Sequence, residues 1–141
     1  MAFIRKEDVT ALFASLESGD ADRFFSHVAD NVTWTVMGTH PLAGTYHDKR
    51  TFIAHTFHRL NAVLKEGVLL KVTGILVCRN TAAVELAALS TAKNGAPFSN
   101  RYCWICRFEN GIIVEVRAYL DSALVQKLLD ENETGDTGSF F

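Results

Sequence analysis

The chain has 141 residues, 48% hydrophobic and 21% charged, and its 14 basic and 16 acidic side chains leave a net charge of −2. This composition excludes a disordered chain, and without a basic excess no nucleic-acid partner is expected. No apolar run reaches the ~18 residues that span a bilayer, so no membrane partner is expected either. The three cysteines do not make a closed disulfide framework, and the N-terminus turns charged too soon for a signal peptide. We therefore expect a cytoplasmic location.

Apolar spacing predicts the elements of the first half of the chain. The apolar residues of segment 6–17 recur at helical spacing, whereas residues 31–37 alternate between apolar and polar as a strand does. Asp20 and Asp48 are placed to cap the helices that follow them. In chain order, this predicts a helix over 6–17, a short helix after Asp20, a strand over 31–37, a loop over 38–44 and a helix over 49–65.

The second half favours strands joined by tight turns. Asn94-Gly95 and Asn110-Gly111 are strong hairpin signals, and a helical apolar pattern follows Asp121. Helices gathered on one face of an antiparallel sheet define the α+β class, and a curved sheet leaves space for a pocket near its open end. This predicts strands over 68–79, 81–93, 98–109 and 112–120, a helix over 121–131, a single domain over 1–131 and a loose tail over 132–141.

Three stretches resemble the cone-shaped α+β superfamily of nuclear transport factor 2, ketosteroid isomerase and the SnoaL-like polyketide cyclases. They are VADNVTW over 28–34 with GTHPLAG over 38–44, NRYCWICRFENGII over 100–113, and EVRAYLDSALVQ over 115–126. The resemblance covers nearly the whole chain up to the tail. It implies a curved antiparallel sheet wrapped around helices, a cystatin-like α+β barrel, and pairing into a homodimer through the sheet.

The resemblance does not extend to the isomerase site. Ketosteroid isomerases place an aspartate base at a slot that holds Thr35 here. The slots of their oxyanion-binding aspartic acid and tyrosine fall near Trp104 and in the helix that holds Phe13. Threonine is no base near neutral pH and tryptophan only donates, so steroid isomerisation by that set of residues is excluded.

The cyclase pattern fits better at the end of the last predicted strand. Those proteins carry an acid/base aspartate there, before a helix with a glutamine, and Asp121 and Gln126 match this pattern. The resemblance thus implies Asp121 as the catalytic residue, since a carboxylate beside an apolar pocket can move a proton next to a carbonyl. The alternative is that Asp121 only caps the final helix. His40, at the expected pocket mouth, is a second catalytic candidate, and a solvated loop histidine is its alternative.

Aromatic and amide side chains are the candidates for ligand contact. Strand alternation places Asn100, Tyr102 and Trp104 on one face, which is predicted to look into the cone. Trp34 is predicted to form part of the pocket wall. Core packing alone is the alternative for both tryptophans.

The last predicted strand has a continuous apolar face, which is expected to look inward and consists of Val114, Val116, Ala118 and Leu120. Arg117 and Tyr119 then point outward, toward a dimer interface. Glu85 interrupts an apolar strand and is expected to pair with Arg101 or Arg117. The alternative for Glu85 is a carboxylate in the pocket that contacts the ligand.

No metal and no cofactor are expected. Cys103 and Cys106 lie three apart on a strand and point to opposite faces, so they do not share a zinc ion. His55 and His58 share a helix face but lack a carboxylate at metal-binding spacing. Nucleotide-binding glycine motifs are also absent from the sequence.

These observations support three hypotheses. The first is a cofactor-independent isomerase or cyclase that acts by proton transfer on a hydrophobic, carbonyl-bearing small molecule. The second is a protein that binds a small apolar ligand without catalysis, and the third is a dimeric interaction module. A carboxylate inside an apolar cavity favours the enzyme, a cavity without one favours the binding protein, and a filled cone favours the interaction module.

Overall fold

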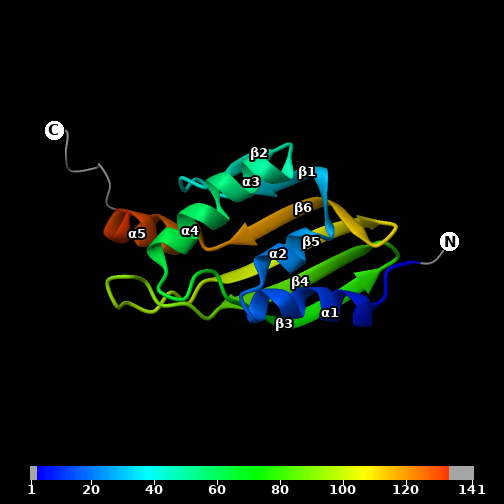
Figure 1. Ribbon diagram of the computed structural model, residues 1–141, viewed down its shortest axis with the longest axis horizontal. Coiled ribbons are helices and arrows are strands. Elements are labelled where there is room, and N and C mark those ends of the chain that lie inside the picture. Colours follow the sequence, from blue (N-terminus) through cyan, green and yellow to red (C-terminus); the bar gives the residue numbers. More distant parts are fainter. Residues whose placement is uncertain (1–2, 134–141) are drawn as a thin grey trace.

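One curved six-stranded sheet carries the fold (Figure 1), and the computed structural model describes residues 3–133. The strands run in the order β2-β1-β6-β5-β4-β3 and comprise β1 (Val28–Val36), β2 (Gly44–Tyr46), β3 (Leu70–Cys78), β4 (Thr81–Ala88), β5 (Arg101–Glu109) and β6 (Ile112–Leu120). The helices are α1 (Lys6–Glu17), α2 (Ala21–Phe25), α3 (Lys49–His55), α4 (Phe57–Val63) and α5 (Ser122–Asn132). The predicted α+β class is confirmed.

Strands β3 to β6 are antiparallel neighbours, as predicted, but the strands predicted over 81–93 and 98–109 are too long, because β4 ends at Ala88 and β5 begins at Arg101. The turn before β6 uses Asn110 at φ 52° and Gly111 at φ 79°, as expected for an Asn-Gly hairpin. β1 adds to the sheet differently, because it pairs with β6 in parallel, with Trp34 opposite Val116. The sequence does not predict β2, since three residues in a turn-rich loop are too few to show an alternation.

The single helix predicted over 49–65 is wrong, because the chain breaks at Thr56 into α3 and α4. Thr56 has φ −120° and ψ −75°, outside the helical region. Its hydroxyl donates a 2.7 Å hydrogen bond to the carbonyl oxygen of Phe52, one turn earlier. A buried threonine that bonds back in this way bends a helix.

The predicted inward face of β6 is correct in its second half and wrong at Val114. The register with β5 shifts between Arg107, which lies opposite Glu115, and Phe108, which lies opposite Ile113. Val114 is therefore the extra residue of a bulge, and Ile113 is buried in its place. After the bulge the predicted alternation holds for the residues Val116, Ala118, Leu120 (inward) and Tyr119 (outward).

The core lies between the sheet and the helices. α1 packs against β3 and α3 packs against β1. Phe13 and Phe24, from α1 and α2, pack edge to face with ring centroids 5.0 Å apart. Residues 134–141 of the predicted loose tail lie outside the described residues. Glu133, within that predicted tail, accepts two hydrogen bonds of 2.9 and 3.0 Å from Arg59 of α4.

Candidate functional site

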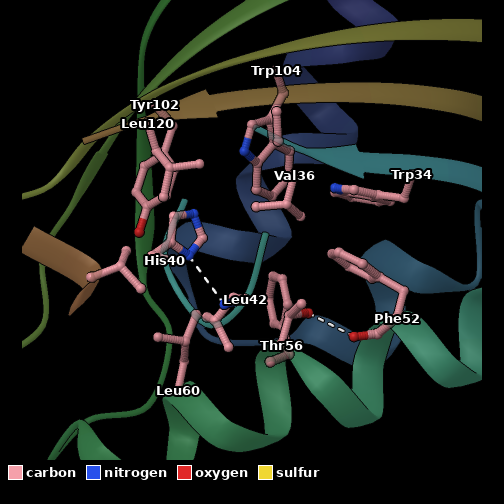
Figure 2. A pocket seen from close by; sticks show the side chains of 13 residues that line it. Trp34, Val36, His40, Leu42, Phe52, Thr56, Leu60, Tyr102, Trp104 and Leu120 are labelled. Carbon is pink, nitrogen blue, oxygen red and sulfur yellow. Dashed lines mark hydrogen bonds between the residues drawn. The ribbon is translucent and has the colours of Figure 1, made fainter. Parts of the chain in front are cut away.

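A small apolar pocket with a cavity volume of about 50 Å³ lies between the sheet, α3, α4 and α5 (Figure 2). Its aromatic lining consists of Trp34, Phe52, Phe57, Tyr102 and Trp104. Its aliphatic lining consists of Val36, Leu42, Leu60, Ala118, Leu120 and Val125. Only His40 and Thr56 add further polar groups. The lining has no carboxylate among the described residues.

The aromatic wall of the pocket is tightly packed. The Trp34 ring stacks on Phe52 with centroids 4.0 Å apart and 20° between the planes. Trp34 also meets Trp104 edge to face at 5.2 Å, and Tyr102 meets Trp104 at 6.4 Å. These rings come from β1, α3 and β5, so the pocket forms only when the sheet and the helix layer are in place.

Each indole carries a buried hydrogen-bond donor. Nε1 of Trp34 and Nε1 of Trp104 have no hydrogen-bond partner among the described residues. In Figure 2 each nitrogen lies on the ring edge turned toward the other lining side chains. A buried donor left unpaired costs about 1–3 kcal/mol of stability.

Tyr102 brings a phenol to the same pocket. The strand alternation of β5 points it inward beside Trp104, as predicted. Burial raises the pKa of Tyr102 well above its ordinary value, so the hydroxyl stays protonated at neutral pH. The group is thus available as a neutral hydrogen-bond donor.

His40 holds the loop that closes one side of the pocket. The backbone N–H of Leu42 donates to Nδ1 at 3.1 Å, so Nε2 carries the ring hydrogen and donates it to the carbonyl oxygen of Met37 at 3.1 Å. Burial lowers the pKa of His40 below its ordinary value and keeps the ring neutral. Both ring nitrogens are used by the backbone. The geometry therefore supports His40 as a loop-positioning residue, and its catalytic role stays a prediction.

The pH dependence of stability tests this arrangement. Because folding lowers the pKa of His40, there is a pH range just below the ordinary histidine pKa of about 6.5 in which only the unfolded chain binds a proton at this residue. The contribution of the neutral His40 to stability is present above that pH and is lost as the pH falls toward the folded pKa, at up to about 1.4 kcal/mol per pH unit.

We expect urea unfolding to show that acidification lowers the free energy of unfolding less for His40→Gln than for the wild type. The amide of glutamine supplies both a donor and an acceptor without titrating. The exposed His58→Gln is the control, and equal slopes for His40→Gln and the wild type would contradict the assignment.

Two of the sequence-predicted residues lie together beside the pocket, not in its lining. Asn100 is fully buried and joins β5 to the start of α5, because its amide accepts from the N–H of Asp121 at 3.1 Å and donates to the Asp121 carbonyl at 3.2 Å. The Asp121 carboxylate is exposed and caps α5, with Oδ1 accepting from the N–H groups of Ala123 at 3.0 Å and Leu124 at 3.3 Å. The predicted cap is confirmed, whereas the acid/base role of Asp121 stays a prediction.

Glu85 lies on the outer face of the sheet, away from the pocket. It is exposed and faces Cys103 on β5. The expected pairing with Arg101 or Arg117 is wrong: no ion pair to Glu85 occurs within residues 3–133. The register explains this, since Arg101 lies opposite Ala87 and Arg117 is two strands away.

The structure thus brings together Trp34, His40, Tyr102 and Trp104, and leaves Asp121, Asn100 and Glu85 outside the lining. Sequence reasoning missed Phe52, Thr56 and Leu42 as pocket residues. Phe52 belongs to a predicted apolar helix face, which does not distinguish pocket from core. Thr56 lines the pocket only because the helix breaks at that residue.

The described residues hold no cluster of three His, Cys, Asp or Glu side chains able to bind a metal ion. Within the same part of the chain, no helix is both long and apolar enough to cross a membrane.

Comparison with known proteins fits this geometry. A family model described as a SnoaL-like domain matches residues 9–116. The dimerizing cyclase phiC of a fungal species (strain ATCC 74256) is 31% identical over 136 residues, 93% of this chain and 59% of that protein. The dimerizing cyclase tstC of Talaromyces stipitatus is 31% identical over 123 residues, 82% of this chain and 53% of that protein. The chain thus spans just over half the length of these curated relatives.

Among solved structures, an NTF2-like protein from Burkholderia thailandensis superposes with a TM-score of 0.74 at 23% identity, covering 87% of this chain and 95% of that one. The curved sheet and its apolar pocket define a protein of the nuclear transport factor 2-like fold. Within that fold, the chain belongs to the SnoaL-like family.

Proposed function

We propose that the protein is a cofactor-independent enzyme of the isomerase or cyclase type, which acts by proton transfer on a hydrophobic, carbonyl-bearing small molecule. The observation that carries the proposal is the apolar pocket with the protonated Tyr102 hydroxyl in its wall. Its membership of the SnoaL-like family and its similarity to two proteins named dimerizing cyclases support it.

The chemistry asks for a donor near the carbonyl oxygen. Removing a proton from the neighbouring carbon places negative charge on that oxygen, and a donor in an apolar pocket stabilises this charge strongly. Tyr102 supplies such a donor in the proposal. Leu120 lines the pocket, and Asp121 follows it directly in the chain at the pocket edge. We assign Asp121 as the acid/base that exchanges the proton, with Oδ1 holding the helix and Oδ2 free of hydrogen bonds within residues 3–133.

Exchange of α-hydrogens tests the proposal without knowledge of the natural substrate. Indan-2-one is flat and apolar, and NMR in D₂O follows the loss of its α-hydrogens. We expect the wild type to accelerate this exchange and Asp121→Asn to lower the rate about 100-fold. Asparagine keeps an oxygen that caps α5 but cannot take the proton, so the fold stays intact. Exchange at the wild-type rate in Asp121→Asn would remove Asp121 from the chemistry.

A second candidate function, ligand binding without catalysis, is favoured by the lack of a carboxylate in the described pocket lining. The same experiment separates the two. A protein that binds indan-2-one in a titration, yet leaves its exchange rate at the background value, is a binding protein.

We also propose a homodimer through the outer face of the sheet. The helices shown in Figure 1 leave that face uncovered. It carries Leu76 at 77% exposure and Tyr119 at 42%, with Ala83 and Ile105 half-buried between them. Such apolar side chains on a sheet surface suit burial against a second copy.

The oligomeric state tests this proposal. We expect light scattering after gel filtration to give twice the 15.6 kDa chain mass for the wild type. Ile105→Glu, which places a charge in the middle of the face, is expected to give a monomer with unchanged circular dichroism. Thr10→Glu, at an exposed position of α1, serves as the control. A monomeric wild type would exclude the dimer.

A further inference from the structure

The pocket concentrates the unpaired donors of the protein. Nε1 of Trp34 and Nε1 of Trp104 are the only buried side-chain N or O atoms without a hydrogen-bond partner in the part of the chain that the structure describes. These residues are also the only two tryptophans of the sequence. Buried polar groups are nearly always paired, so two such exceptions in one pocket call for an explanation.

The neighbouring polar groups do not relieve the indoles. The Thr56 hydroxyl donates to Phe52, and both nitrogens of His40 bind the backbone. The Tyr102 hydroxyl can also accept a hydrogen bond, but it takes none from either indole N–H within residues 3–133. An indole N–H is a donor only, so what the two tryptophans lack is a hydrogen-bond acceptor within reach.

The indole faces are already used. Phe52 covers one face of Trp34, and the edge of one tryptophan meets the face of the other. Phe13 packs against Trp104 with centroids 5.9 Å apart. A cation needs an open aromatic face, whereas the N–H edges are what this pocket leaves unpaired.

We propose that Trp34 and Trp104 form an acceptor-recognition pair, whose N–H groups bind oxygen acceptors such as carbonyls on an uncharged, flat, apolar ligand. The pair selects these ligands over those that carry a hydrocarbon group or a positive charge at that edge. The inference rests on the proposed function, because it names the substrate class of the same pocket. The two indoles are specificity-determining residues in it, independent of the proton transfer assigned to Asp121.

A matched pair of probes tests the inference. Acetophenone and α-methylstyrene have nearly the same shape and differ in whether oxygen or a methylene group is doubly bonded to the carbon. Because the two indole N–H groups have no partner among the described residues, we expect acetophenone to bind about tenfold more tightly. Its binding should also move both indole N–H signals downfield in a ¹⁵N–¹H spectrum, where the whole protein gives two such signals. Equal affinities would overturn the inference, as would tighter binding of phenyltrimethylammonium.

An isosteric replacement of both indoles supplies the matched control. Incorporation of 3-benzothienylalanine in place of tryptophan changes N–H to sulfur at Trp34 and Trp104 and nowhere else. We expect the preference for acetophenone to disappear, the affinity for α-methylstyrene to stay the same, and the melting temperature of the ligand-free protein to be equal or higher. A retained preference would overturn the inference.

The outcomes separate the inference from the proposed function. If neither acetophenone nor α-methylstyrene binds, the pocket does not take apolar small molecules, and the proposed function and the inference both fail. If both bind equally, the inference fails alone. If acetophenone is preferred but indan-2-one exchange stays at the background rate, the inference holds and the catalytic proposal fails.

Discussion

Trp34→Ala is expected to lower the free energy of unfolding by about 3–5 kcal/mol, a large part of the roughly 5–15 kcal/mol that stabilises a domain of this kind. Trp34 is fully buried, stacks on Phe52 and meets Trp104 edge to face. Its removal leaves a cavity beside an existing pocket, and the rigid strands β1 and β6 cannot close it. Urea unfolding followed by circular dichroism measures the loss.

Phe3→Ala is the matched control for this prediction, because Phe3 is a large aromatic residue at an exposed position. We expect its effect to stay within about 0.5 kcal/mol. A loss below about 1 kcal/mol in Trp34→Ala would show that the aromatic wall contributes little to stability. Trp34 would then be retained for ligand contact alone.

Tyr102→Phe is expected to slow α-hydrogen exchange of indan-2-one about 100-fold, the usual cost of removing one donor to a developing oxyanion. Phenylalanine keeps the ring and its contact with Trp104, so stability and the affinity for the ketone should change little. Because burial raises the pKa of Tyr102, the phenol keeps its proton as the pH rises. Ionisation of the phenol should not reduce the rate anywhere below about pH 10, the ordinary tyrosine value.

NMR exchange rates and ketone titrations on the same samples separate turnover from binding. Leu120→Ala, which trims an apolar side chain of the same pocket, is the control, and it should weaken ketone binding more than it slows exchange of bound ketone. An exchange rate in Tyr102→Phe within about twofold of the wild type would contradict the donor role.

The fold is largely predictable where its signals are local. Asn110-Gly111 specifies the β5–β6 hairpin, and Asp121 specifies the start of α5, because each acts within a few residues. The break at Thr56 is not predictable in the same way. A threonine in a helix pattern bonds back to the preceding turn or turns to solvent according to its burial, which tertiary packing decides. The bulge at Val114 likewise depends on how β5 and β6 align.

The site residues likewise divide into those that a local sequence signal predicts and those that depend on tertiary packing. Tyr102 and Trp104 follow from strand alternation and the apolar face of β5. Trp34 follows from its place before the Gly38 loop in the stretch that carries the family resemblance. The exposure of Asp121 depends on how α5 leaves the sheet, and the outward position of Glu85 depends on which strand lies opposite. Both are tertiary properties without a local sequence signal.

The parallel pairing of β1 with β6 has a consequence for the order of folding. β3 to β6 follow one another along the chain, so we expect them to pair first, whereas β1 pairs with a strand that lies far along the chain, with Trp34 opposite Val116. Closing so long a loop is entropically slow, and chains rich in such distant pairings fold in milliseconds to seconds. The aromatic wall of the pocket is thus completed only when β1 docks, after the meander has formed. Until then Trp104 lacks its contact with Trp34, and the pocket that we propose to bind a ligand stays incomplete on that side.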